Sequence, residues 1–235
     1  MSTMAGVEDQ DGHALLNVYN TIRAAILDGT LAPASTVSQT ALGQIAGASR
    51  TPVREAVRIL VHEGLVISDE NRRVRIRPMT PANLEDLQIS RIALESAGIR
   101  LTVPRLDPEE LAELEGVLAQ MAHYHRMEDF DRFEVPHRKF HLMLITGLGQ
   151  TMTDHVASLY DQVASYRRVY GKPDNFSVRQ HEHRELLDFV IAREPDKAAT
   201  ALIDHYLNAV DDVFPGLDPD YSPARLQELA AYLRG

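Results

Sequence analysis

Apolar side chains in the first quarter of the chain recur every three to four residues, which is the period of an amphipathic helix. One stripe ends at Asp28-Gly29, a helix stop signal, and a second short stripe follows the N-cap residue Ser38 and ends at Gly47. A third stripe begins at Thr51-Pro52, where proline fits the first helical position, and ends near Glu63-Gly64. The pattern predicts three helices with a tight turn between the second and the third.

Beyond the third helix the apolar period changes to two, which is typical of β-strands. Residues 65–67 are apolar, and residues 74–77 alternate between apolar side chains and arginine. The polar residues 69–72 separate these stretches, so the pattern predicts a β-hairpin. Three helices and a hairpin form a winged helix-turn-helix, which we place at residues 13–77 after a disordered segment at residues 1–12.

The second part of the chain is helical throughout. Residues 78–81 contain two prolines and form a linker, after which helical periods continue to residue 214 without an alternating strand. Proline, glycine and short polar breaks divide residues 82–214 into about six helices. A proline- and glycine-rich stretch then precedes one short helix, so we assign residues 215–235 to a C-terminal tail. The predicted fold class is mainly α: a winged helix-turn-helix followed by an all-α bundle.

Composition narrows the class of protein. The 235 residues are enough for two domains, each with its own core. The absence of cysteine excludes disulfides and thiol chemistry and is compatible with a reducing cytoplasm. No apolar run reaches the length of a membrane span, and no signal-peptide pattern opens the sequence. We therefore expect a soluble cytoplasmic protein.

The predicted third helix carries a basic surface. Arg50, Arg54 and Arg58 are four residues apart beside the apolar stripe, so their guanidinium groups face away from the core. Arginine pairs well with phosphate oxygens and with guanine edges. Residues 50–77 hold seven arginines and four acidic residues, whereas residues 81–235 hold 16 basic and 26 acidic residues. An acidic protein with one basic region favours DNA binding by the first domain alone.

Two motifs in this region, SRTPVREA at residues 49–56 and EGLV at residues 63–66, resemble those of the GntR family of bacterial transcription regulators. The resemblance implies base or phosphate contacts by the arginines, phosphate contacts at the helix N-terminus, and a wing in the minor groove. One departure is Pro33-Ala34, where the family usually has proline and glycine. The expected DNA-binding residues are Ser49, Arg50, Thr51, Arg54, Arg58, Arg72 and Arg73.

Four histidines of the second domain lie on the apolar faces of their predicted helices. His137 and His141 are four residues apart and share one face, while His183 and His205 each lie in register with apolar residues of two later helices. Buried imidazoles need partners, and four that converge would suit zinc, nickel or another borderline divalent ion. Single core histidines hydrogen-bonded to the backbone are the alternative interpretation.

The same region, residues 84–207, resembles the FadR-type C-terminal effector domain of the GntR family, an all-α bundle. The metal-binding branch of that domain has an aspartate, a histidine four residues later, and one histidine on each of two later helices. His141, His183 and His205 match this pattern, and His137 stands at the aspartate position. The resemblance implies a divalent metal ion, zinc or nickel, at a site with one fewer negative charge.

Arg91 shares a helical seam with Leu87 and Leu94, so its guanidinium group is expected to point inward. It can form an ion pair with Glu95 four residues later, or it can bind the carboxylate of a small organic acid, as the effector pockets of this subfamily do. The two roles are compatible.

The sequence therefore predicts a homodimeric, repressor-type regulator that reads an inverted repeat in double-stranded DNA and responds to a small carboxylate effector bound beside a metal ion. One alternative is a domain of the same family without a metal ion, which senses a ligand through Arg91 alone or serves only in dimerisation. A rival from another class is a metallohydrolase on the histidine cluster, with Glu134 as its general base.

Overall fold

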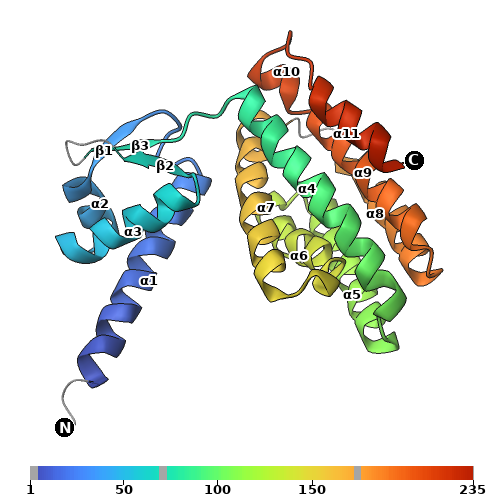
Figure 1. Cartoon of the computed structure of the whole chain (residues 1–235), viewed down its shortest axis with the longest axis horizontal. Helices are drawn as coiled ribbons and strands as arrows, with labels where there is room; N and C mark the ends of the chain where they lie inside the picture. Colours follow the sequence, from blue (N-terminus) through green and yellow to red (C-terminus); the bar gives the residue numbers. More distant parts are fainter. Residues whose placement is uncertain (1–4, 69–72, 172–175, 235) are drawn as a thin grey trace. The chain divides into compact units, whose positions relative to one another are not determined.

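The computed structural model describes residues 5–68, 73–171 and 176–234. The chain forms two compact units, which divide between Met79 and Thr80 (Figure 1). This boundary falls inside the linker that the prolines at residues 78–81 predict.

The first unit is a winged helix-turn-helix. Its elements, in chain order, are α1 (Ala5–Leu27), β1 (Thr36–Ser38), α2 (Gln39–Ala46), α3 (Arg50–His62), β2 (Val66–Ser68) and β3 (Arg73–Ile76). The three helices and the hairpin are confirmed. Helix α1 begins at Ala5, so residues 5–12, for which the sequence predicts disorder, are helical here.

The sheet has a third strand that the sequence pattern does not reveal. The strand order is β1-β3-β2, with both pairs antiparallel, and Val37 of β1 lies opposite Val74 of β3. Strand β1 has only three residues, too few for a period to be recognised. In β3 the expected alternation holds, because Val74 and Ile76 are buried while Arg73 and Arg75 are exposed.

Helix α3 differs slightly from its prediction. It begins at Arg50 with Ser49 as N-cap residue, two positions before the predicted cap Thr51. Proline is tolerated in a first turn, whose N–H groups lack partners within the helix, so Pro52 does not fix the first residue. The apolar stripe is buried at Val53, Ala56, Val57 and Leu60, but Val61 lies at its edge and is 38% exposed.

The loop before β1 turns at the unusual pair Pro33-Ala34. The Ser35 N–H donates to the carbonyl of Ala32 (3.1 Å), which closes a four-residue turn with Ala34 at its third position. Ala34 has φ of 64°, the left-handed region that a type II turn requires and that favours glycine. Alanine in this position therefore carries conformational strain.

We expect Ala34→Gly to stabilise the first unit by about 0.5 to 1 kcal/mol, because relief of the left-handed strain exceeds the added entropy of the unfolded chain. Urea denaturation measures the change in the free energy of unfolding. Ala32→Gly is the matched control, because Ala32 is exposed in the same turn and is not among the residues with positive φ. A lower stability for Ala34→Gly than for the parent protein would contradict the strain.

The second unit is a helical bundle, and the six long helices among its described residues confirm the predicted number. They are α4 (Pro81–Thr102), α5 (Pro108–Arg126), α6 (Phe130–Met143), α7 (Gln150–Tyr170), α8 (Phe176–Ile191) and α9 (Pro195–Asp211). Two short 3-10 turns, η1 (Val103–Arg105) and η2 (Thr146–Leu148), lie between them. Within the described residues, no helix combines the length and apolarity of a membrane span.

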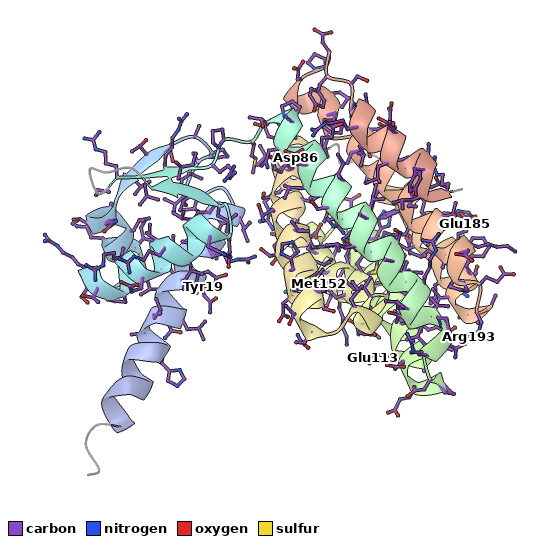
Figure 2. The ribbon with its side chains drawn as sticks, in the orientation of Figure 1. Tyr19, Asp86, Glu113, Met152, Glu185 and Arg193 are labelled. Carbon is purple, nitrogen blue, oxygen red and sulfur yellow. The ribbon has the colours of Figure 1, made fainter. Side chains whose placement is uncertain are left out.

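Caps fix the helix starts locally. The Thr80 hydroxyl accepts a hydrogen bond from the Asn83 N–H (3.2 Å), and Asp107 and Glu110 form a capping box at the start of α5. Helix α4 packs against α7, α9 and α11 (Ala224–Arg234), so it lies at the centre of the bundle's packing (Figure 2).

Residues 215–234 are part of the second unit, whereas the sequence predicts a C-terminal tail at residues 215–235. The short helices α10 (Phe214–Leu217) and α11 (Ala224–Arg234) end the chain, and Leu226 and Ala230 of α11 are buried. Glu85 of α4, only 2% exposed, accepts hydrogen bonds from the Tyr221 hydroxyl (2.7 Å), the Arg225 guanidinium (2.6 Å) and the backbone N–H of Leu226 (3.1 Å). These contacts join α11 and the loop before it to a residue about 140 positions earlier in the chain. A local sequence pattern cannot indicate contacts over such a separation.

Candidate functional site

The candidate DNA-binding surface is the outer face of α3. Ser49, Arg50 and Thr51 are exposed at its N-terminus, and the side chains of Arg54 and Arg58 are 58% and 69% exposed. Two predicted residues lie in the wing: Arg73 is exposed in β3, and Arg72 lies outside the described residues.

Glu55 separates the arginines on this surface. It forms ion pairs with Arg54 (3.3 Å) and Arg58 (2.9 Å). Although desolvation raises it, hydrogen bonds from the two arginines bring the pKa of Glu55 below its usual value, so the carboxylate is ionised. Exposed ion pairs of this kind contribute little stability, and both guanidinium groups can exchange Glu55 for phosphate oxygens at small cost.

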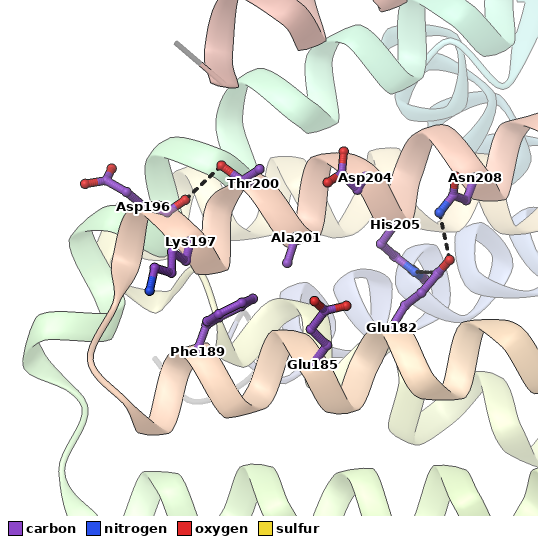
Figure 3. Close-up of a pocket in the computed structure, with 10 residues that line it drawn as sticks. All are labelled: Glu182, Glu185, Phe189, Asp196, Lys197, Thr200, Ala201, Asp204, His205 and Asn208. Carbon is purple, nitrogen blue, oxygen red and sulfur yellow. Dashed lines mark hydrogen bonds and ion pairs between the residues drawn. The ribbon is translucent and has the colours of Figure 1, made fainter.

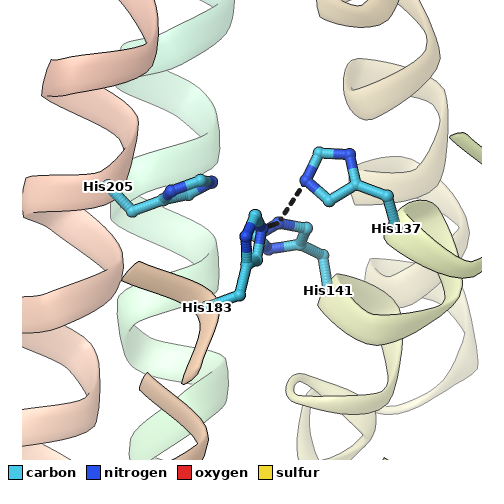
Figure 4. A group of neighbouring side chains, drawn as sticks. All are labelled: His137, His141, His183 and His205. Atoms are coloured by element: carbon cyan, nitrogen blue, oxygen red, sulfur yellow. Dashed lines mark hydrogen bonds between the residues drawn. The ribbon is translucent and has the colours of Figure 1, made fainter. Parts of the chain in front are cut away.

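The four histidines of the second unit lie together in the bundle. His137 and His141 come from α6, His183 from α8 and His205 from α9, and all four are buried. One potential ligand atom from each lies within 4.8 Å of the others. The Nε2 atom of His141 is 3.1 Å from that of His137 and 3.3 Å from that of His183 (Figure 4).

These spacings fit a coordinated cation. Two nitrogens that each lie 2.0–2.1 Å from a tetrahedral zinc ion are about 3.3 Å apart. Burial lowers the pKa of His137 and His141 well below its usual value, and the neighbouring imidazole and guanidinium groups lower it further. Both rings are therefore neutral, which is the form that binds a metal ion. His137, His141 and His205 each have a side chain as a hydrogen-bond partner at Nδ1.

His137 and His141 each contact a tyrosine hydroxyl through Nδ1, and each tyrosine in turn contacts a glutamate. His137 Nδ1 lies 2.7 Å from the Tyr160 hydroxyl, which donates to Glu134 (3.0 Å). Arg167 in turn donates to Glu134 (3.0 Å) and to the Tyr160 oxygen (3.3 Å). Glu134, the base of the hypothetical hydrolase, is thus occupied by Arg167 and Tyr160.

A second set has the same arrangement around His141 of α6, with Tyr206 from α9 and with Glu95 and Arg91 from α4. His141 Nδ1 lies 3.1 Å from the Tyr206 hydroxyl, which donates to Glu95. Arg91 donates to Glu95 (2.7 Å) and to the Tyr206 oxygen (2.5 Å). Burial raises the pKa of Tyr160 and Tyr206 well above its usual value, so both phenols keep their protons.

Arg91 is fully buried, as its seam predicts, and the expected ion pair with Glu95 is present. Although desolvation lowers it, Glu95 raises the pKa of Arg91, so the guanidinium group stays charged. Its Nη1 atom is buried without a hydrogen-bond partner among the described residues. A buried donor without a partner is costly, and an anion or an ordered water molecule would satisfy it.

His205 connects the cluster to a groove between α8 and α9. Its Nδ1 atom lies 2.8 Å from Glu182, which also accepts from the Asn208 side chain (2.8 Å). The groove has a volume of about 400 Å³, and the carboxylates of Glu182, Glu185, Asp196 and Asp204 line it together with His205 (Figure 3). An acidic groove beside an imidazole ligand attracts cations rather than anions.

Sequence reasoning missed the residues that surround the histidines. Tyr206 and Glu182 are each next in sequence to a predicted ligand, and that proximity is the only available signal. Tyr160 belongs to α7, which carries none of the four histidines, and no pattern pointed to it. Arg167, from the same helix, is one of two arginines that the sequence offers as a further contributor to the effector site, but an exposed position was expected, and its side chain is only 15% exposed.

A winged helix-turn-helix followed by a helical bundle is the architecture of a class of DNA-binding transcription regulators. Residues 15–76 match the bacterial regulatory proteins of the gntR family, and residues 86–208 match the FCD domain. The chain therefore belongs to the GntR family of transcription regulators and carries an FCD domain.

Similar proteins agree with this assignment. An HTH-type transcriptional regulator of Streptomyces ambofaciens is 31% identical over 201 residues, with 84% of each chain covered. The regulator BphR of Paraburkholderia xenovorans is 30% identical over 209 residues, with 83% of each chain covered. Among solved structures, McbR/YncC of Escherichia coli has the same fold, with a TM-score of 0.75 at 20% identity over 86% of this chain and 97% of that one.

The family and these relatives are transcription regulators and not enzymes. The metallohydrolase alternative is therefore rejected.

Proposed function

We propose that this GntR-family regulator binds an inverted-repeat operator as a homodimer and releases it when a small organic acid binds beside a divalent metal ion. The proposal rests on one observation: four buried imidazoles converge next to Arg91, a buried arginine whose Nη1 donor has no hydrogen-bond partner among the described residues. In such a dimer the two DNA-binding units can adopt more than one relative arrangement. A ligand that binds one arrangement more tightly than another shifts the population toward it.

The metal ion would be held by His137, His141, His183 and His205, with zinc or nickel as the preferred ions. It would supply a Lewis-acidic centre that anchors a carboxylate. An all-histidine site is neutral before the ion binds, so the bound ion keeps its positive charge and attracts an anionic effector. The replacement of aspartate by His137 therefore favours anion binding.

The carboxylate would also take the unpartnered Nη1 donor of Arg91. The other guanidinium donors already hold Glu95 and Tyr206, so the side chain cannot turn away from the ligand. Pre-organised donors bind an anion without paying for rearrangement.

The DNA contacts would come from Ser49, Arg50, Thr51, Arg54 and Arg58 on α3 and from Arg72 and Arg73 in the wing. A two-fold homodimer would place one α3 in each of two successive major grooves. The relative GlaR of Escherichia coli, 24% identical over 208 residues, is named a transcriptional repressor, which supports repression as the mode of action.

The DNA assignment is tested by Arg54→Ala. Loss of a base or phosphate contact should cost about 1–3 kcal/mol of binding free energy and abolish a specific footprint on the promoter region of its own gene. Arg132→Ala, which removes an exposed arginine from the second unit, is the control and should keep the footprint. An unchanged footprint in Arg54→Ala would overturn the role of α3.

The metal assignment is tested on protein purified without chelators or nickel resin. Elemental analysis should find about one zinc or nickel ion per chain, and His141→Ala should lose it because one ligand of the site is removed. His155→Ala, an exposed histidine of α7, should retain the ion. Absence of any ion from the parent protein, before and after incubation with zinc, would leave the metal-free sensor as the correct description.

The effector class is tested by thermal-shift screening of small organic and sugar acids, with and without zinc. An effector acid should raise the melting temperature only in the presence of the metal ion. Arg91→Lys keeps the charge but loses the planar fork, so it should abolish the shift while its own unliganded melting temperature reports on folding. A shift that does not need zinc would assign ligand binding to Arg91 alone, and no shift with any acid would refute a carboxylate effector.

A further inference from the structure

The proton of the Tyr206 hydroxyl can be placed by counting donors and acceptors. Arginine only donates hydrogen bonds, and an ionised carboxylate only accepts them. Arg91 therefore donates to the Tyr206 oxygen, and Glu95, which is ion-paired with Arg91, must accept. If the phenolic proton pointed to His141 instead, the oxygens of Tyr206 and Glu95 would face each other in close contact without a hydrogen between them.

With its proton assigned, the Tyr206 oxygen can only accept further hydrogen bonds, through its two lone pairs. Its single proton goes to Glu95, and one lone pair accepts from Arg91. The second lone pair must accept from His141 Nδ1, 3.1 Å away. The imidazole of His141 therefore carries its proton on Nδ1, and its Nε2 lone pair points into the histidine cluster.

The same count applies to Tyr160. Glu134 is ion-paired with Arg167 and accepts the phenolic proton at 3.0 Å, while Arg167 donates to the phenol oxygen at 3.3 Å. The remaining lone pair accepts from His137 Nδ1 at 2.7 Å. His137 and His141 are thus both held in the Nδ1-protonated tautomer, each by its own set of tyrosine, glutamate and arginine. His205 has the same tautomer without a tyrosine, because the carboxylate of Glu182 accepts from its Nδ1.

This assignment has a consequence at the centre of the cluster. The Nε2 atoms of His137 and His141 are 3.1 Å apart, and with both protons on Nδ1 two lone pairs face each other there. Lone pairs at this distance repel unless a cation lies between them. The tyrosines thus exclude the tautomer in which one imidazole donates to the other, and they leave a cation as the favourable occupant.

We propose that Tyr160 and Tyr206 are positioning residues of the metal site, which hold His137 and His141 in the Nδ1-protonated tautomer and thereby present two Nε2 lone pairs to the ion. The proposal rests on the proposed metal binding. In other metal sites, loss of a group that orients a ligating histidine typically lowers metal affinity 10- to 100-fold.

The first experiment measures zinc affinity by competition with a chromophoric chelator. Tyr206→Phe and Tyr160→Phe should each bind zinc about 10- to 100-fold more weakly than the parent protein. Tyr166→Phe is the matched control, because Tyr166 is also buried in α7 but its hydroxyl contacts Thr80 and Asn83 at the start of α4. Affinities within about twofold of the parent in both test variants would overturn the proposal.

The second experiment observes the tautomers directly, by nitrogen-15 NMR of the histidine rings in the metal-free protein. The parent should carry the proton on Nδ1 of His137 and His141. Tyr206→Phe should let the proton of His141 move to Nε2, from which it can donate to His137 Nε2, while His137 keeps its own proton on Nδ1. Tyr160→Phe should do the reverse. A loss of packing alone would not select one ring in this way, and Nε2 protonation of both rings in the parent would refute the assignment.

The two measurements separate the proposals. A parent protein with both Nδ1 protons in place that binds no zinc would refute the proposed metal function while the tautomer assignment stands. A parent that binds zinc tightly but shows no effect of either tyrosine substitution would refute the positioning role alone. If one variant fails to fold, the other still decides, because the two sets share no residue.

Discussion

The buried ion pair between Arg91 and Glu95 is the constraint on which the second unit depends. Both side chains are essentially inaccessible to solvent, and removing two charges from water costs several kcal/mol per ion unless attraction and further hydrogen bonds offset it. Tyr206 supplies those hydrogen bonds, and the rings of Tyr160 and Tyr206 lie 4.9 and 4.3 Å from the guanidinium carbon. The aromatic residues that compensate the charge are the ones that touch the histidines, so the ion pair and the cluster form one polar network.

Helix α4 carries this network and connects it to the rest of the unit. Glu85 near its start holds the C-terminal helix α11, and Arg91 and Glu95, about two and three turns later, face the cluster. Its first residues are fixed by Tyr166 of α7, whose hydroxyl contacts Thr80 and Asn83. Because α4 follows directly on the linker, the helix that contacts the candidate effector site is also the one that begins where the DNA-binding unit ends. A ligand at Arg91 would therefore act on the element nearest to the linker in the chain.

The first unit places its charge differently. Arg54 and Arg58 lie on an exposed helix face and pair with Glu55, at a cost in stability close to zero. In the second unit Arg91 and Glu95 are buried and are held by each other and by Tyr206. This contrast fits the proposed function, in which DNA phosphates would replace Glu55 as the partner of the exposed arginines, whereas the buried pair would hold a small site rigid.

The sequence by itself determined the features that depend on neighbours within a few residues. Caps, prolines and apolar periods located the recognition helix and the six long helices of the bundle, and the four histidines were assigned to inward faces because helix geometry fixes which residues share a face. It did not locate β1, which is too short to show a period, or the packing of α11 on Glu85. Only the tertiary structure decided that Tyr160 and Arg167 of α7 stand behind His137 and that Tyr206 lies between His141 and Arg91. These contacts join residues on different helices, and their energies depend on distances that no local pattern of polar and apolar positions encodes.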